Sequence, residues 1–277
     1  MSEPLQLAEQ TLRDGDPRAA LANLTTAVKA KAADPALRVF MAQLLCVLGQ
    51  WERAHTQLNV VAEMDPKAAP MREMVGHALR CELMREQVFA GKRTPMVFGH
   101  PEPWLAQLIE SLLQGARGNA ALADDLAARA FDAAPASPGR IGDQRFEWIA
   151  DADSRLGPVL EAFVNGRYYW VPFTRLAKVA FEKATDLRDM VWLPAQLLFD
   201  NGGEVIAMVP TRYPGSQASD DGAIQLARRT EWREGGKDRW FGLGQRVFAT
   251  DAGEHDLLNL RSIEFDPHPP SDDAENT

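Results

Sequence analysis

The chain has 277 residues, of which 45% are hydrophobic, which is enough for two modest domains and a sizeable core without disulfide staples. Its formal net charge is −9, so it lacks the basic surface with which a nucleic-acid-binding protein neutralises phosphates. The charge is uneven, since residues 141–277 hold 15 Lys and Arg against 23 Asp and Glu. An acidic surface of this kind keeps a protein soluble and can steer basic partners toward it.

The cysteine content and the N-terminus predict a cytoplasmic protein. Cys46 and Cys81 are the only cysteines, and both fall within helix-like segments, where buried, reduced thiols are expected. The residues after Met1 contain neither the basic region nor the apolar stretch of a signal peptide, and no apolar run approaches the ~20 residues that span a bilayer. No CxxC pair or cysteine–histidine cluster predicts a metal site, and no cofactor is expected.

Residues 1–140 contain an internal repeat with a spacing of 34 residues. Small and apolar residues recur at this spacing in three pairs, which are Gly15 and Gly49, Ala20 and Ala54, and Leu24 and Leu58. An Asp-Pro pair closes each unit, at residues 34–35 and 65–66. The arrangement resembles tetratricopeptide repeats, although the tryptophan and tyrosine of that family's first helix are missing. We therefore predict a degenerate tetratricopeptide-like helical array over residues 1–140.

Such an array has two possible roles. Repeat units cannot bury their apolar faces alone, and about three or more of them stack to share one core. Stacking leaves a concave surface, which commonly receives a peptide or a helix. The first hypothesis is therefore that the array binds a partner on this surface. The alternative is that it only supports the second half of the chain.

Residues 141–265 predict an α+β domain, because aromatic, β-branched and glycine-punctuated runs replace the alanine- and leucine-rich helices. The turn residues 200–203 (DNGG) between two apolar runs indicate a hairpin. Residues 245–249 and 258–264 are expected to form another. Strands joined by hairpins predict an antiparallel sheet or a small, partly open barrel.

Other segments of this half are predicted from local patterns. Short helices are expected at residues 144–149, 155–164 and 173–182. Residues 220–228 fit a helix, whereas residues 224–232 fit a strand equally well, and the choice stays open. Residues 266–277 are rich in Pro, Asp, Ser and Asn, which predicts a disordered acidic tail.

The segment at residues 146–161 separates the two halves and carries two carboxylates and an arginine, Asp151, Asp153 and Arg155. The D-x-D spacing is typical of a cation site, but a calcium loop would continue with oxygen ligands where Arg155 and Ala162 stand. Asp153 or Ser154 can instead cap the helix expected at 155–164, and a lost cap costs about 1 kcal/mol. We therefore interpret the segment as a structural joint.

No catalytic motif is recognisable. The five histidines have no nucleophile or carboxylate at a recognisable spacing, and residues 242–244 (GLG) are too short for a phosphate-binding loop. We predict that the protein is not an enzyme. The alternative is an uncharacterised enzyme whose site lies near Asp151, Asp153 and Arg155.

Aromatic residues concentrate in the second half, most densely at residues 168–170. Successive residues of a strand face opposite sides, so one face of this strand presents aromatic area to another layer or to a partner. We take the following residues as candidates for partner binding: Tyr168, Tyr169, Trp170, Trp192, Asp151, Asp153 and Arg155. A further alternative is a structural module that dimerises through the aromatic face.

Six short segments of the second half form a recognisable combination. They are residues 148–158 (WIADADSRLGP), 168–172 (YYWVP), 187–195 (LRDMVWLPA), 209–215 (VPTRYPG), 229–232 (RTEW) and 242–246 (GLGQR). Together they resemble the ImpE/TagJ family of bacterial type VI secretion accessory proteins, also called SciE-type virulence proteins. Degenerate helical repeats in front of this region are also a feature of that family.

The resemblance implies a cytoplasmic, non-enzymatic partner of the contractile sheath, with no role on nucleic acid or membrane. Members of the family are understood to bind the N-terminal helix of the small sheath subunit. They thereby bear on sheath handling by the AAA+ ATPase that recycles it. The resemblance carries over no catalytic residues and assigns no binding surface. The residues themselves offer two candidate surfaces, the concave face of the repeats and an exposed sheet face near Tyr168–Trp170.

Overall fold

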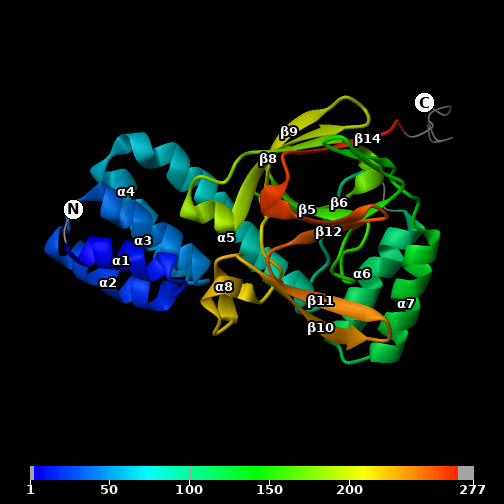
Figure 1. Ribbon diagram of the computed structural model, residues 1–277, viewed down its shortest axis with the longest axis horizontal. Coiled ribbons are helices and arrows are strands. Elements are labelled where there is room, and N and C mark those ends of the chain that lie inside the picture. Colours follow the sequence, from blue (N-terminus) through cyan, green and yellow to red (C-terminus); the bar gives the residue numbers. More distant parts are fainter. Residues whose placement is uncertain (1–2, 100–101, 268–277) are drawn as a thin grey trace.

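The computed structural model describes residues 3–99 and 102–267. Figure 1 shows a helical array at one end of the molecule, layers of strands toward the other, and helix α5 (Ala69–Phe89) between them. The predicted fold class is confirmed, since helical repeats come first and a mostly antiparallel sheet follows. Of the two forms expected for the strands, the open sheet is the one that forms. Among the described residues, no helix is long and apolar enough to cross a membrane.

The repeats consist of two antiparallel helix pairs. Their helices are α1 (Glu3–Arg13), α2 (Pro17–Ala30), α3 (Pro35–Val47) and α4 (Trp51–Met64). Asp16 and Asp34 cap α2 and α3, because each carboxylate accepts backbone N–H bonds of the first turn. Gly15 and Gly49 turn the chain within each pair at positive φ, 91° and 67°, which glycine adopts at little cost. The 34-residue spacing of these glycines is therefore the spacing of two equivalent turns.

Helix α5 connects the repeats to the sheet. It follows the 3-10 helix η1 (Pro66–Ala68) and packs against α4 on one side and strand β6 (Arg167–Pro172) on the other. Val75 and Leu79 of α5 belong to the same apolar core as Trp170 and Trp192. A further antiparallel pair, α6 (Pro103–Ala116) and α7 (Ala120–Ala133), contributes to this core.

The main sheet has nine strands in the order β1-β6-β5-β9-β8-β7-β14-β2-β3. Besides β6, these are β1 (Met96–Val97), β2 (Gly139–Ile141), β3 (Gln144–Phe146), β5 (Val159–Val164), β7 (Leu176–Phe181), β8 (Trp192–Phe199), β9 (Glu204–Pro210) and β14 (Ser262–Phe265). Neighbouring strands are antiparallel except β1 and β6, which are parallel. The hairpin predicted around residues 200–203 is confirmed as β8 and β9.

Two smaller sheets complete the second half. The three-stranded sheet has the order β13-β12-β4, with β4 (Ile149–Asp151), β12 (Val247–Thr250) and β13 (Gly253–Asp256). The other pairs β10 (Thr230–Gly236) with β11 (Arg239–Gly244). Ile149 and Phe248 of the three-stranded sheet share a second apolar core with Leu160 and Val171 of the main sheet. The main sheet therefore lies between two cores.

Three segments that were expected to be helices are strands. Residues 144–149 form β3 and the start of β4, residues 155–164 form a turn and β5, and residues 173–182 form the 3-10 helix η2 (Phe173–Arg175) and β7. The physical reason is clearest in β5, whose residues are buried on both faces. Such a strand is a continuous apolar run, and periodicity alone does not distinguish it from a buried helix.

The C-terminal part of the chain also departs from expectation. Residues 258–264 do not pair with residues 245–249, because β12 pairs with β13 and β4, whereas β14 pairs with β2 and β7. The choice between helix and strand at residues 220–232 stayed open, and the structure contains both. The short helix α8 (Gly222–Gln225) is followed by strand β10.

The predicted boundaries at residues 140 and 265 stay predictions. Strands β1 and β2 begin before residue 140 and belong to the main sheet, and one core extends from the repeats into that sheet. Of the predicted tail, residues 268–277 lie outside the described residues.

Candidate partner-binding site

The joint at residues 146–161 is a turn between two strands. Strand β4 ends at Asp151 and β5 begins at Val159. The Asp153 carboxylate holds the turn, because it accepts the backbone N–H of Arg155 at 2.9 Å and that of Gly242 at 2.8 Å. The predicted helix cap is therefore wrong, since the residues that follow fold as a turn and a strand.

Arg155 fastens this turn to two other elements. Its Nε donates to the Asp153 carboxylate at 2.8 Å. Its guanidinium also lies over the rings of Phe89 of α5 and Phe241 of β11, at 5.1 and 4.7 Å from the ring centroids. The pair of Asp153 and Arg155 thus connects the turn to helix and sheet, which agrees with a structural role.

A chain of four charged side chains crosses the interior behind the turn. Arg85 of α5 donates two hydrogen bonds to Glu161 of β5, from Nε at 2.8 Å and from Nη2 at 2.9 Å. Arg246 forms ion pairs with both Glu161 and Asp151. All four side chains are buried. Two positive and two negative charges alternate, so each buried charge has a partner of opposite sign.

The two carboxylates of this chain titrate differently. Burial by itself raises the pKa of Glu161, but the guanidinium groups of Arg85 and Arg246 outweigh it and lower that pKa to about 2. Burial dominates at the other carboxylate and raises the pKa of Asp151 to about 7, although Arg246 acts in the opposite direction.

A carboxylate with a raised pKa is a common feature of catalytic sites, but Asp151 is fully engaged inside the protein. Its oxygens accept hydrogen bonds from the Tyr213 hydroxyl at 3.0 Å and the Asp153 backbone N–H at 2.9 Å, and they pair with Arg246. Asp153 is equally buried. The carboxylates near Arg155 therefore act here as hydrogen-bond acceptors for the protein itself.

Metal and thiol chemistry receive no support from the geometry. Within residues 3–99 and 102–267, no three His, Cys, Asp or Glu side chains gather closely enough to hold a metal ion. Cys46 and Cys81 are free and buried, and burial raises the pKa of each thiol to about 12. Such thiols stay protonated at neutral pH and are poor nucleophiles and ligands.

Three of the four aromatic candidates are covered by other parts of the protein. Tyr168, Trp170 and Trp192 are buried in the core that α5 and the repeats share with the sheet. The indole N–H of Trp170 donates to the Tyr168 hydroxyl at 2.6 Å, and that of Trp192 donates to Glu82 of α5 at 2.8 Å. Tyr169, on the opposite face, is half-buried. The expected exposed sheet face is therefore absent at Tyr168 and Trp170, because their strand faces another layer; partner contact by these residues stays a prediction.

Part of the surface of the repeats packs against the second half of the chain. Helix α3 packs against the 3-10 helix η3 (Leu187–Met190), and the Arg212 guanidinium donates to the carbonyl oxygen of Val47 at 2.8 Å. Arg228 donates to the carbonyl oxygens of Leu12 and Arg13, each at 2.9 Å. These are the supporting contacts of the alternative hypothesis, and binding on the concave face stays a prediction.

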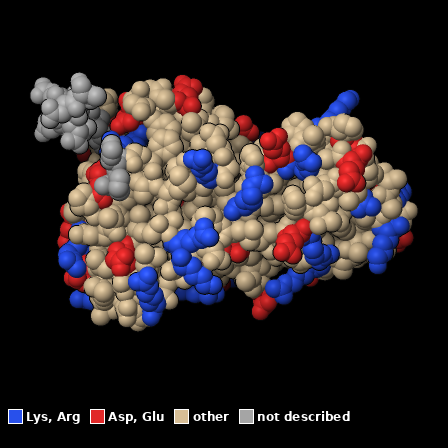
Figure 2. Space-filling view, turned by 180° about the vertical axis from the view of Figure 1, so that it is seen from behind, with Lys and Arg blue, Asp and Glu red and all other residues tan. Residues whose placement is uncertain are grey.

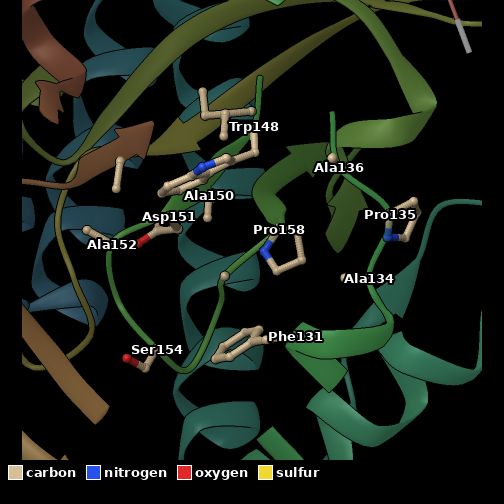
Figure 3. Close-up of a pocket in the computed structure, with 13 residues that line it drawn as sticks. Phe131, Ala134, Pro135, Ala136, Trp148, Ala150, Asp151, Ala152, Ser154 and Pro158 are labelled. Carbon is tan, nitrogen blue, oxygen red and sulfur yellow. The ribbon is translucent and has the colours of Figure 1, made fainter. Parts of the chain in front are cut away.

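An open pocket of about 490 Å³ borders the outer side of the same turn. Figure 3 shows Trp148 and Phe131 on opposite sides of it, with Pro158 between them and Pro135 at one margin. Trp148 is 42% exposed and Phe131 is 37% exposed, which is unusual for such large apolar side chains. This volume and lining are typical of a site that receives apolar groups.

Sequence reasoning did not select these residues. Most aromatic residues of the second half are expected in the core, so their concentration there does not single out Trp148, and Phe131 is one apolar residue of an alanine-rich segment. The available signal was the run of residues 131–138 (FDAAPASP). In this run Phe131 lies in the last turn of α7, and two prolines follow the end of the helix.

Charge on the rear face of the molecule does not single out a second site. Figure 2 shows Lys and Arg side chains scattered over this face with Asp and Glu among them. Such mixing is typical of an ordinary soluble surface.

Comparisons with known proteins agree with this architecture. Residues 143–264 match the family model described as ImpE protein, and residues 11–76 match a tetratricopeptide repeat model. The crystal structure of protein VPA1032 from Vibrio parahaemolyticus matches with a TM-score of 0.86 at 25% identity, over 95% of this chain and 98% of that chain. The type VI secretion system accessory component TagJ of Pseudomonas aeruginosa is 47% identical over 261 residues, which cover 94% of this chain and 92% of that protein. Identity of this extent over nearly the whole length means that the chain belongs to the ImpE/TagJ family.

Proposed function

We propose that this protein is a non-enzymatic accessory component of a bacterial type VI secretion system and acts in the cytoplasm. It binds the N-terminal helix of the small contractile-sheath subunit and thereby affects how the AAA+ recycling ATPase handles the sheath. The observation that carries the proposal is the 47% identity with a type VI secretion accessory component over 94% of the chain.

Features of the molecule support a binding role over a catalytic one. Tetratricopeptide-like repeats commonly serve in protein–protein contacts, and the apolar pocket beside Trp148 offers a surface that a helix can cover. In contrast, the candidate acidic residues are occupied, since Asp151 and Asp153 each pair with an arginine and accept backbone N–H groups.

The two alternatives have less support. A dimer through the aromatic face needs exposed aromatic area at Tyr168 and Trp170, and both side chains are buried. An enzyme with its site near Asp151, Asp153 and Arg155 needs a group free to meet a substrate, and the two carboxylates are engaged by arginine, tyrosine and backbone groups of the protein.

Binding can be measured directly by fluorescence anisotropy with a labelled peptide of the sheath subunit's N-terminal segment. We expect saturable binding with a Kd below ~100 μM, a generous limit for a specific contact. A peptide of the same composition in scrambled order is the control, since it loses the apolar stripe of a helix. Absence of saturation at ~100 μM, or equal binding of the scrambled peptide, would contradict the proposal.

The effect on the ATPase needs a second assay. Purified sheath is incubated with the recycling ATPase, and its disassembly is followed by light scattering with and without this protein. A change in rate is expected, which disappears when free N-terminal peptide competes. An unchanged rate at saturating protein would separate peptide binding from sheath handling and would overturn the latter.

A further inference from the structure

The pocket beside Trp148 is built to receive side chains and not a further strand. Its floor includes β4, which is the outer strand of the three-stranded sheet. The backbone N–H of Asp151 donates to the carbonyl oxygen of Gly157 at 2.7 Å, so the outer edge of β4 is already bonded at this point. A partner that adds a strand would need this edge to be free, whereas a helix needs only an apolar surface for one stripe of its side chains.

The base of the pocket is formed by small side chains, which leave the space above it open. Ala150 of β4 pairs with Ala249 of β12, and both line the pocket together with Ala152. Both strands are half-buried at these alanines and buried at the residues on either side. Between the taller walls of Trp148 and Phe131, such a floor allows close approach of a partner element. The pocket therefore fits apolar residues that project from one face of a helix.

The margin of the pocket carries negative charge. Glu254 of β13 pairs with Ala249 across the sheet, so its side chain leaves the sheet on the face that lines the pocket. Asp256 lies two residues further on that strand and projects from the same face. Both are exposed, and neither forms an ion pair within residues 3–99 and 102–267.

The arginines of the neighbouring segments do not balance these charges, because each is already paired. Their pairs are Arg129 with Asp125, Arg140 with Glu264, Arg145 with Asp266, and Arg239 with Asp124. A partner that brings cationic side chains alongside its apolar stripe would thus meet unpaired carboxylates.

We infer that this pocket is the binding site of the sheath helix and that it selects an amphipathic helix with Lys or Arg beside the apolar stripe. The inference rests on the proposed function, because the sheath peptide is the occupant. It adds the surface that binds and the charge pattern that the surface accepts. Trp148 and Phe131 are the apolar contacts, and Glu254 and Asp256 supply the charge.

Substitutions in the full chain test the apolar part, with the labelled sheath peptide as probe. Trp148→Ala removes one wall and is expected to raise the Kd about tenfold or more, as for other exposed aromatic anchors. Ile206→Ala is the matched control, because Ile206 is 70% exposed on β9 and lines a different pocket. It is expected to change the Kd by less than about twofold. The opposite ranking of the two variants would overturn the inference.

The charge pattern has its own test. The double substitution Glu254→Gln and Asp256→Asn is expected to weaken binding about three- to tenfold at ~50 mM salt and much less at ~500 mM salt. The matched control is Glu52→Gln with Glu63→Gln, two exposed carboxylates of α4 in the repeats. Replacing Lys and Arg of the peptide by Gln should abolish the difference between the proteins. Equal salt dependence in both double variants would overturn the charge rule.

A crosslinking experiment separates the possible failures without any change to the protein. A peptide with a benzophenone side chain on its apolar stripe is irradiated with the unaltered full chain, and the attached residues are found by mass spectrometry. Crosslinks at residues 131–136 or 148–158 support the inference. Binding with crosslinks only elsewhere, such as the concave face of the repeats, overturns the inference and leaves the proposed function intact. No binding by the unaltered protein overturns the proposed function, and the inference with it.

Discussion

The two sides of the segment at residues 146–161 have opposite chemistry. Toward the interior, Asp151, Asp153 and Glu161 are buried with arginine partners. Toward solvent, Trp148 leaves much of its indole exposed beside an apolar pocket. In most proteins charge lies outside and apolar area lies inside, so both departures call for a reason. Buried, paired charges connect elements of the fold. Exposed apolar area stays in contact with water, and a partner that covers it gains binding free energy.

If this comparison holds, the largest loss of stability comes from breaking the interior chain of charges. Glu161→Ala leaves Arg85 and Arg246 buried without their shared carboxylate. The free energy of unfolding is expected to fall by about 3–5 kcal/mol, as for other broken buried pairs. Urea denaturation measures it, with Glu264→Ala as a control that breaks only exposed pairs and costs about 1 kcal/mol or less. Equal losses of unfolding free energy in the two variants would contradict the expected difference between buried and exposed ion pairs.

Acid should weaken the protein through the same carboxylate. The pKa of Glu161 is lower in the folded protein than in the unfolded chain, about 2 against 4.5, so the folded state binds fewer protons. Its contribution is complete above about pH 4.5, is lost as the pH falls toward about 2, and amounts to about 3 kcal/mol. Denaturation of the unaltered protein and of Glu161→Gln between pH 7 and pH 2 measures this. Parallel profiles below pH 4.5 would show that Glu161 is not the group responsible.

Asp153→Ala should cost more than a lost helix cap. The change leaves Arg155 without its partner and the buried N–H of Gly242 without an acceptor. We expect about 2–4 kcal/mol of destabilisation, against about 1 kcal/mol for a cap. Ser154→Ala, which removes one hydrogen bond to the N–H of Trp240, is the neighbouring control. A melting temperature that is unchanged by Asp153→Ala, together with lost partner binding, would make the joint itself the binding site.

The smallest effect on stability is expected on the outer side. Trp148→Ala should change the free energy of unfolding by about 1 kcal/mol or less, because the side chain is already 42% exposed. The fully buried Trp170 offers the contrast, since Trp170→Ala is expected to cost about 3–5 kcal/mol. Thermal unfolding of the two variants is the measurement. A large loss from Trp148→Ala would mean that the indole supports the fold and is not held ready for a partner.

Much of the fold could be predicted from local patterns. The glycines at a spacing of 34 and the Asp-Pro pairs predicted where the helices of the repeats end, because the backbone preferences of these residues act within a few positions. The same holds for residues 200–203, whose turn preference located the hairpin of β8 and β9. The combination of short motifs in residues 148–246 likewise predicts the family that the comparisons show.

The tertiary structure alone decided how residues 146–161 are used. Arg85 and Glu161 lie 76 positions apart, and Arg246 and Glu161 lie 85 apart, so no local pattern records that they meet. Burial of β5 on both faces erased the alternation that would have shown a strand, and the same burial turned Tyr168 and Trp170 inward. The segment was recognised from its charges, yet those charges belong to the interior. The open surface beside it is apolar, and only the packing of α7 against the turn created it.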